Sequence, residues 1–322
     1  EGNLHRMLAY TIRRIVYLIP VLFVLTVVVF GFVQMLPGDI IDTMIGEEDV
    51  EDPEVRLALE KEFGLDKPIY VQYGKWLLRA VRGEFGKSLI TRRPVTFELL
   101  EGIPATVYLA IVGIGISMLI AVPLGTIAAV RRNSSTDYVA QVTSLAGISI
   151  PEFWFAIMCV LLFSLYLGWL PSSGYISPFE DFQQSLKFLI LPAAAVGFRQ
   201  AAFTTRLTRS SMLDEMNKEY VDTARSLGFR DRKVIYKYTL RNAMIPTITI
   251  SGLQFANLLG GTVVLETIFA WPGIGRAIFE AIIQRDYPLI QAGVLVLGVI
   301  VVVINLLVDL TYRYLNPRVE LS

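Results

Sequence analysis

Six long stretches of apolar residues constrain this chain more than any other feature of its sequence. A helix needs about 20 predominantly apolar residues to cross the hydrocarbon core of a bilayer. Six segments fit that requirement: residues 13–36, 104–130, 138–167, 188–210, 246–268 and 289–313. We therefore predict an all-α membrane protein with six transmembrane helices, whose transmembrane core runs from 104 to 313.

The composition disfavours a soluble enzyme. Only 18% of the residues are charged and the mean hydropathy is +0.54, whereas about a quarter of the residues of a soluble domain are charged. The net charge is zero and the basic residues are dispersed, so we expect no nucleic-acid partner. The lone cysteine, Cys159, lies in an apolar run, and we expect it to be a buried small hydrophobe.

The first apolar stretch is expected to stay in the mature protein. It runs for about 22 residues after Arg14 and ends in LPGD, whereas a signal-peptide core has about 7–15 residues and a small-residue cleavage site. Residues 1–6 precede Met7 and could be an added leader.

Basic residues orient the predicted helices. Lys and Arg concentrate in cytoplasmic loops. With six spans, the basic segments all fall on one side of the membrane: Arg13 and Arg14, Arg131 and Arg132, Lys218 to Arg241, and Arg313 and Arg318. Both termini, residues 1–12 and 314–322, are therefore predicted to be cytoplasmic. The fourth stretch carries Arg199, Arg206 and Arg209, so its second half must face protein or water rather than lipid.

The longest predicted external piece is residues 37–103, between the first two spans. Long loops of this kind are usually functional or disordered. Tyr73, Trp76 and Phe85 indicate that this loop folds onto the membrane domain.

A charged, helix-prone insert at 214–245 separates the fourth and fifth spans. Tyr220, Val221, Ala224 and Leu227 recur near helical spacing, and Gly228 suits a helix C-terminus. Asp231 is placed to cap a second short helix. An amphipathic element of this kind either docks on a partner and transmits its movement or lies on the lipid surface. The residues alone leave these two alternatives open.

Polar residues inside the spans mark a possible pathway. Glu152 follows Pro151 within the third span, and Arg199 lies near the middle of the fourth. An ionisable residue at that depth is a functional hypothesis by default, although a structural Glu152–Arg199 pair is the plainer alternative. Ser251, Gln254 and Asn257 form a polar stripe on the fifth span, either packing helices together or lining the pathway.

Sites for catalysis or nucleotide binding are not predicted. The GKS sequence at 86–88 resembles part of a phosphate-binding loop, but the required first glycine is replaced by Val81. His5 alone offers no metal site, and no nucleophile–base set is present. We expect no cofactor on this chain, so any ATP and Mg²⁺ would be bound by partner subunits.

The insert EYVDTARSLGFRDRKVIYKYTLRNAMIP resembles the coupling segment of the dipeptide and oligopeptide family of ABC importer permeases. Ala224, Gly228 and Leu240 match the general importer pattern, whereas Asp222-Thr223 replace Glu-Ala and Arg241 stands in place of Pro. Those departures are typical of the peptide subfamily, but they put in doubt an acidic contact at Asp222. Further segments resemble the family along nearly the whole chain: RRIVYLIPVLFVLTVVVFGFVQMLPGD, FGLDKPIYVQYGKWL, GEFGKSL, ISIPEFWFAI, LGWLPSSGY, GGTVVLETIFAWPGIGRAIFEAIIQRDYPLIQ and NLLVDLTYRYLNPRV.

The resemblance implies a permease subunit in the cytoplasmic (inner) membrane, itself not an enzyme. Its expected partners are a second, similar permease, two ATP-binding subunits, an external solute-binding protein and the lipid bilayer. The residues implied in coupling to the ATPases are Glu219, Tyr220, Asp222, Ala224, Arg225, Gly228 and Arg230. Family members handle dipeptides, oligopeptides, glutathione, nickel complexes or oligosaccharides. A stand-alone channel or secondary transporter would explain the spans but not the insert.

Overall fold

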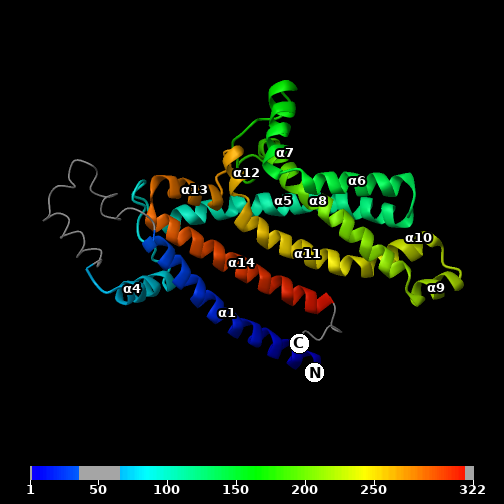
Figure 1. Ribbon diagram of the computed structural model, residues 1–322, viewed down its shortest axis with the longest axis horizontal. Coiled ribbons are helices and arrows are strands. Elements are labelled where there is room, and N and C mark those ends of the chain that lie inside the picture. The colour runs from blue at the N-terminus through cyan, green and yellow to red at the C-terminus, as the bar shows by residue number, and fades with distance from the viewer. Residues whose placement is uncertain (1, 36–65, 316–322) are drawn as a thin grey trace. The chain divides into compact units, whose positions relative to one another are not determined.

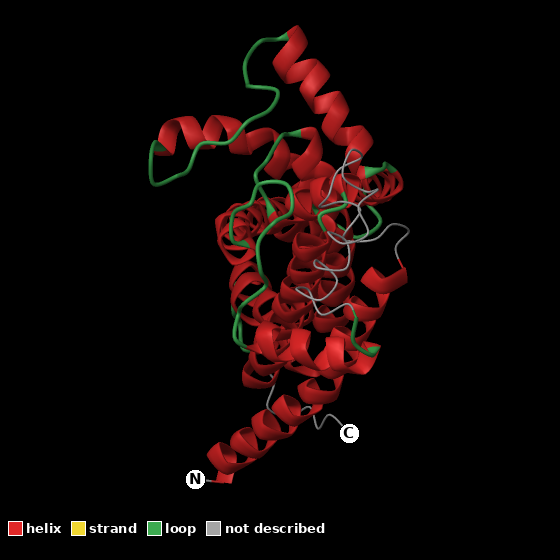
Figure 2. Ribbon diagram, turned by 90° about the vertical axis from the view of Figure 1, so that its left-hand side faces the viewer, coloured by secondary structure: helices red, strands yellow, loops and turns green. Residues whose placement is uncertain are grey.

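The computed structural model describes residues 2–35 and 66–315, and helices dominate these ranges (Figures 1 and 2). Strand structure within them is limited to an isolated bridge between Lys87 and Pro94. The helices, in order, are α1 (Gly2–Met35), α4 (Ile69–Val81), α5 (Val95–Val130), α6 (Ser135–Ser149), α7 (Glu152–Cys159), the π-helix η1 (Val160–Tyr166), α8 (Phe182–Met216), α9 (Glu219–Ser226), α10 (Asp231–Lys233), the π-helix η2 (Val234–Thr239), α11 (Leu240–Gly261), α12 (Val263–Ile268), α13 (Ile274–Gln284) and α14 (Tyr287–Leu315).

Helices that are long and apolar enough to span a membrane account for most of this length. Five helical segments are long and apolar enough to cross a bilayer, and the count rises to six if a bent pair is one span. The five are residues 11–35, 95–130, 182–216, 231–261 and 287–311. The expected all-helical membrane fold is confirmed.

The third predicted span, 138–167, is not one continuous helix. It consists of α6 followed by α7 and η1, with a bend of 99° between the two parts. Pro151 lacks a backbone N–H and clashes with a helical residue before it. Ile150 accordingly adopts an extended conformation with ψ of 124°, and the helix restarts at Glu152.

Several other boundaries differ from the predicted ones. The second span begins at Val95 rather than 104, because Pro94 starts the helix. The fifth predicted span, 246–268, is interrupted at Thr262, between α11 and α12. Of the predicted external loop, residues 37–65 lie outside the described residues; the remainder contains α4 and the first turns of α5. Residues 316–322 of the predicted tail also lie outside them.

The chain divides into two compact units. The first comprises residues 1–104 and 272–302, and the second comprises 105–271 and 303–322.

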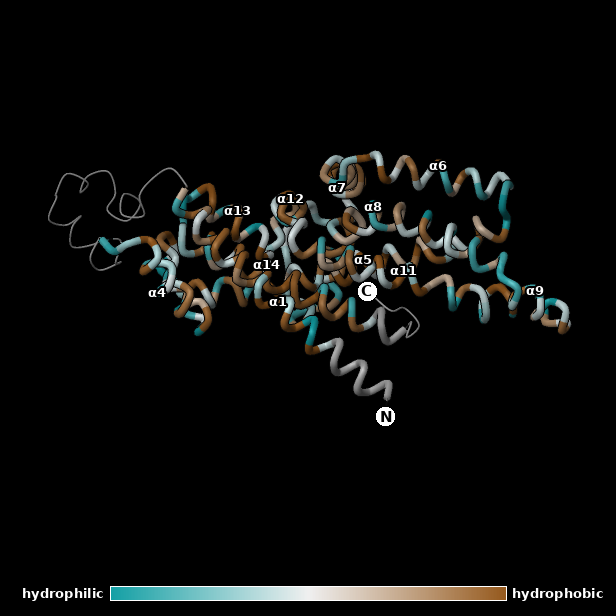
Figure 3. Tube along the Cα trace, turned by 60° about the horizontal axis from the view of Figure 1, so that its bottom comes forward, coloured by the Kyte–Doolittle hydropathy of each residue, from teal (hydrophilic) through white to brown (hydrophobic). Residues whose placement is uncertain are grey.

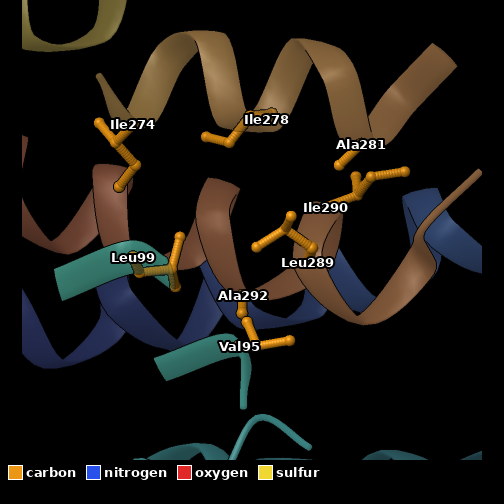
Figure 4. Close-up of a cluster of buried hydrophobic side chains, with 8 residues drawn as sticks. All are labelled: Val95, Leu99, Ile274, Ile278, Ala281, Leu289, Ile290 and Ala292. Atoms are coloured by element: carbon orange, nitrogen blue, oxygen red, sulfur yellow. The ribbon is translucent and has the colours of Figure 1, made fainter. Parts of the chain in front are cut away.

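An apolar cluster holds the first unit together. Figure 4 shows α13 and the start of α14 packing on the first turns of α5. The buried side chains are Val95, Leu99, Ile274, Ile278, Ala281, Leu289, Ile290 and Ala292. A Cβ at Gly102 would lie 3.0 Å from the backbone nitrogen of Ile274. Only glycine therefore lets α5 approach the N-terminus of α13 this closely.

Close helix crossings hold the second unit together. A Cβ at Gly125 of α5 would lie 2.7 Å from the backbone oxygen of Thr205 in α8. Small residues at such crossings are a common way to pack helices in lipid. Thr204, Thr205 and Thr208 of α8 are all buried, as expected for a helix half that faces protein.

Candidate functional site

Pro151 places Glu152 in the first turn of α7, at the edge of a cavity of about 510 Å³. The cavity lies within the second unit and is lined by residues of α6, α7, α8 and α11. Its polar lining consists of Glu152, Arg199, Gln200, Gln254 and Asn257. Helices far apart in sequence thus bring together four of the five predicted pathway residues.

The fifth predicted pathway residue, Ser251, does not line this cavity. Its side chain is buried and its hydroxyl lies 3.3 Å from the sulfur of Met118 in α5. Ser251 therefore packs α11 against α5. A polar stripe on a helix has two edges, and spacing alone does not tell which edge faces the opening.

Glu152 and Arg199 form a loose ion pair. The carboxylate oxygen Oε2 lies 3.9 Å from Nη1 of Arg199. The Arg199 side chain is 55% exposed, whereas that of Glu152 is 20% exposed. Because 3.9 Å exceeds the length of a direct hydrogen bond, both groups retain capacity to bind another charged molecule.

Gln254 is held in place by α8. Its side-chain oxygen accepts a hydrogen bond from the Thr204 hydroxyl at 3.3 Å. Gln254 and Asn257, which lies one helical turn further along α11, both line the cavity. The cavity therefore combines one carboxylate, one guanidinium and amide groups.

A second carboxylate of the same unit, that of Asp137, is fully committed to structure. Arg209 of α8 donates from Nε to Oδ1 of Asp137 at 2.6 Å and from Nη2 to Oδ2 at 2.8 Å. The backbone N–H of Asn133 and the side-chain amide of Gln141 also donate to Asp137, which is 1% exposed. The sequence predicted that Arg209 faces protein or water rather than lipid, but it did not identify Asp137 as the partner of Arg209.

Glu266, at the far end of the second unit from α9, is a further residue that sequence reasoning missed. It is fully buried in α12 and accepts hydrogen bonds from the hydroxyls of Thr106 and Thr262, at 2.7 and 2.9 Å. Trp271 is also fully buried and donates from Nε1 to the backbone oxygen of Ala105 at 2.9 Å. The chain that follows α12 is thus held against α5 by a buried hydrogen bond.

The predicted coupling insert forms a helical hairpin between α8 and α11 (Figure 1). Figure 3 shows hydrophilic residues gathered around α9 and in the link between α5 and α6. In the hairpin, Val221 and Ala224 of α9 pack against Val234 of η2, and all three are buried. We call residues 217–239 the coupling hairpin.

Gly228 ends α9 with a left-handed turn, at φ of 78°. Its N–H donates to Arg225 O and the N–H of Phe229 donates to Ala224 O, which is a Schellman motif. Nothing lies within 4 Å of a Cβ built on Gly228, so glycine is needed for its conformation rather than for space.

Changing Gly228 to alanine is therefore expected to destabilise the hairpin by about 1 kcal/mol, because alanine disfavours positive φ. Gly115, an exposed helical glycine of α5 with nothing within 4 Å of its Cβ, provides the control. Gly115→Ala should be neutral or stabilising by up to about 1 kcal/mol. Hydrogen exchange of the 217–239 amides measures the difference, and equal protection in both variants would contradict this assignment.

The seven predicted coupling residues separate into two groups. Glu219, Asp222, Arg225, Gly228 and Arg230 are exposed, but Ala224 is buried inside the hairpin. The Tyr220 hydroxyl donates to Oε2 of Glu215 at 2.7 Å and accepts from Asn242 at 3.1 Å. Tyr220 is thus half-buried, and burial raises the pKa of its phenol. Tyr220 and Ala224 build the hairpin; the other five are available to a partner.

Comparison with known proteins gives these features a family. The sequence profile of the family described as binding-protein-dependent transport system inner membrane component matches residues 121–321, and the profile of its N-terminal part matches residues 7–110. The chain belongs to this permease family. It is therefore a multi-pass inner-membrane protein and a permease component of an ABC transporter, as the resemblance implied.

Relatives of this permease cover its full length. It is 41% identical to the dipeptide transport system permease protein of Alkalihalophilus pseudofirmus, over 98% of this chain and 100% of the relative. It is 39% identical to an oligopeptide transport system permease protein of Bacillus subtilis, over 98% and 100%. It is 40% identical to the glutathione transport system permease protein of Escherichia coli K12, over 98% and 99%.

A solved structure supports the permease fold. A chain of the methionine ABC transporter in an inward-facing conformation superimposes with a TM-score of 0.54 at 17% identity. The match covers 68% of this chain and 97% of the other. At this identity, the likeness establishes the fold alone.

Proposed function

We propose that this permease forms half of the translocation pathway of an importer for di- and oligopeptides. A second, similar permease forms the other half, two ATP-binding subunits drive the cycle, and an external binding protein delivers the solute. ATP and Mg²⁺ are bound by the ATP-binding subunits, and both termini of this chain face the cytoplasm. The full-length relatives named for dipeptide and oligopeptide transport support the substrate class.

The cavity chemistry fits a peptide. A peptide in water carries an ammonium and a carboxylate at its two ends, so a site with one carboxylate and one guanidinium complements both. Glu152 is placed to accept from the ammonium and Arg199 to donate to the carboxylate, while Gln254 and Asn257 offer amide groups to the peptide bond. The volume of about 510 Å³ lies in the usual range for small-molecule sites.

The coupling hairpin is attached to the helices that line this cavity. Tyr220 bonds to Glu215 on α8 and to Asn242 on α11. Arg199 lies on the same uninterrupted α8, about 24 Å from Glu215 at 1.5 Å per residue. A push on the exposed face of the hairpin would therefore move both helices, which supports docking by an ATPase over resting on lipid.

Reconstitution tests the proposal directly. The permease pair, ATP-binding subunits and binding protein would be placed in proteoliposomes, and uptake of labelled dipeptides would be followed with and without ATP. Uptake that needs both ATP and the binding protein is expected. Uptake driven by an ion gradient without ATP would show a stand-alone transporter instead.

The substrate class is tested by competition. Unlabelled tripeptides and tetrapeptides are expected to displace the labelled dipeptide from the binding protein. Displacement only by glutathione, nickel complexes or oligosaccharides would assign the chain to another branch of the family.

Glu152→Gln is expected to lower ATP-dependent peptide uptake by about tenfold or more, because a hydrogen bond to a charged group contributes roughly 1.5–3 kcal/mol. Assembly with the partner subunits should be unchanged. Glu84→Gln, at an exposed residue outside this cavity, is the matched control and should transport normally. If Glu152→Gln transports at the wild-type rate, the pathway role assigned to Glu152 is wrong.

A further inference from the structure

The first unit contains a basic pocket with no role in the proposed transport mechanism. Its volume is about 390 Å³, and it lies between the end of α4, the loop that follows α4 and the start of α14. Three cationic side chains line it: Arg79, Lys87 and Arg92. Among the described residues, no acidic side chain lines this pocket.

The side chains of these three cations are unpaired within the part of the chain that the structure describes. None of them forms an ion pair with another described residue. The neighbouring Arg93, in contrast, pairs with Glu101 at 3.0 Å. Three exposed positive charges around one hollow repel one another, and a bound anion would relieve that repulsion.

Buried hydrogen bonds shape the loop that carries two of these cations. The Ser88 hydroxyl donates to Oδ2 of the buried Asp286, and the Leu89 N–H donates to Oδ1 at 3.2 Å. The Ser88 hydroxyl oxygen also accepts from the N–H groups of Ile90 and Thr91, at 3.2 and 3.0 Å. Lys87 and Arg92 are therefore presented from an ordered turn.

Membrane orientation gives no reason for so many basic residues here. The segment from 66 to 93 contains Lys67, Lys75, Arg79, Arg82, Lys87, Arg92 and Arg93, against Asp66 and Glu84. Lys and Arg usually concentrate in cytoplasmic loops, whereas this segment lies in the predicted external loop. The excess is confined to this segment, because residues 37–65 of the same predicted loop hold ten acidic residues against Arg56 and Lys61.

The position of α4 indicates which partner. The Tyr73 hydroxyl is 2.8 Å from that of Thr26, and the ring of Trp76 lies 5.6 Å from that of Phe30. Thr26 is about 13 Å from Met35 along α1, at 1.5 Å per residue. Helix α4 therefore lies beside an apolar span rather than beyond its end.

Side chains on both helices are suited to lipid contact. Val24, Val27 and Val28 of α1 are exposed, as are Ile69, Tyr70, Leu78 and Val81 of α4. Tyr and Trp side chains are enriched at the head-group level of membranes. Apolar side chains with adjacent cations are typical of helices that bind anionic lipid surfaces.

We propose that this pocket binds the phosphate of an anionic phospholipid head group. Arg79, Lys87 and Arg92 supply the donors, and the acyl chains of the lipid lie along α1 and α4. Lipid is favoured over a free phosphate or an acidic protein because exposed apolar residues continue from the pocket along α4. The site is separate from the peptide cavity and does not depend on the identity of the transported solute.

The test compares two triple variants of the complete transporter in nanodiscs. The pocket variant carries Arg79→Gln, Lys87→Gln and Arg92→Asn; asparagine is chosen because residue 92 has φ of 60°. The control variant carries Lys67→Gln, Lys75→Gln and Arg82→Gln, which removes the same charge from the same segment but outside the pocket. Binding of a fluorescent phosphatidylglycerol, in competition with phosphatidylcholine, is the readout.

The wild type and the control variant are expected to prefer phosphatidylglycerol. The pocket variant should lose at least about tenfold of that preference, since each basic residue near a charged surface contributes roughly fivefold. If the triple variant does not fold, Lys87→Gln alone against Lys75→Gln should show a smaller loss of the same kind.

Four results would overturn the proposal. The first is an equal loss in the pocket and control variants, and the second is no preference for phosphatidylglycerol in the wild type. The third is displacement of the lipid by millimolar inorganic phosphate, which would indicate a free-phosphate site. The fourth is an unchanged lipid preference with weakened docking of the external binding protein, which would indicate an acidic protein partner.

Discussion

Replacing Asp137 by alanine is expected to destabilise the permease by about 3–5 kcal/mol. The change leaves the guanidinium of Arg209 in a largely buried position without its carboxylate, and an uncompensated buried charge has a cost of that size. It also removes the acceptor for the Asn133 N–H and for Gln141. Thermal unfolding of the purified protein in nanodiscs would measure the loss.

Glu280→Ala provides the control for this prediction. Glu280 pairs with Arg276 at 2.7 Å, but its side chain is 50% exposed, and exposed pairs contribute about 1 kcal/mol or less. The double variant Asp137→Ala/Arg209→Met should recover part of the lost stability, because it removes the unpaired charge. Equal losses for Asp137→Ala and Glu280→Ala would contradict a structural role for the pair.

Replacing Val221 by aspartate is expected to lower ATP-driven uptake to about a tenth of the wild-type rate or less. Val221 is fully buried between α9 and η2. An unpaired carboxylate there would cost about 3 kcal/mol or more, enough to open the coupling hairpin. If an ATPase docks on the hairpin, ATP hydrolysis should then continue without peptide transport, or the ATPase should dissociate.

Thr223→Asp tests whether the effect depends on burial. Thr223 lies on the same short helix but is exposed, so an added carboxylate stays in water. Because that carboxylate stays exposed, the protection of the 217–239 amides from hydrogen exchange should stay at the wild-type level in Thr223→Asp, as for most surface substitutions, and should be lost in Val221→Asp. Normal transport by Val221→Asp would instead favour a hairpin that only rests on the lipid surface.

The helical membrane fold could be predicted from the sequence because the length of the apolar stretches alone indicates a lipid environment. The approximate positions of the long helices followed for the same reason. The break at Pro151 was visible as a proline, but its 99° bend depends on packing of α6 and α7 against α8. The interruption at Thr262 carried no such signal, since GGTVVL reads as one apolar run.

Most of what could not be predicted at the site depends on contacts between residues that are far apart in the sequence. Asp137 and Arg209 are separated by 72 residues, and neither sequence environment indicates the other. Ala224 was expected among the coupling residues and is buried in the hairpin, whereas Ser251, expected either to pack helices together or to line the pathway, packs on Met118. Helical spacing gives a face, but only the tertiary neighbours decide what covers that face.

The absent side chain at Gly125 has a consequence for how the pathway opens. With α5 and α8 in backbone contact, neither helix has room to slide or rotate past the other. Thr204 and Thr208 tie α11 to the same pair through Gln254 and Thr247. The cavity beside Arg199 is thus bordered by a rigid group of helices. Access to the cavity must therefore change through movement of the segments that face this group.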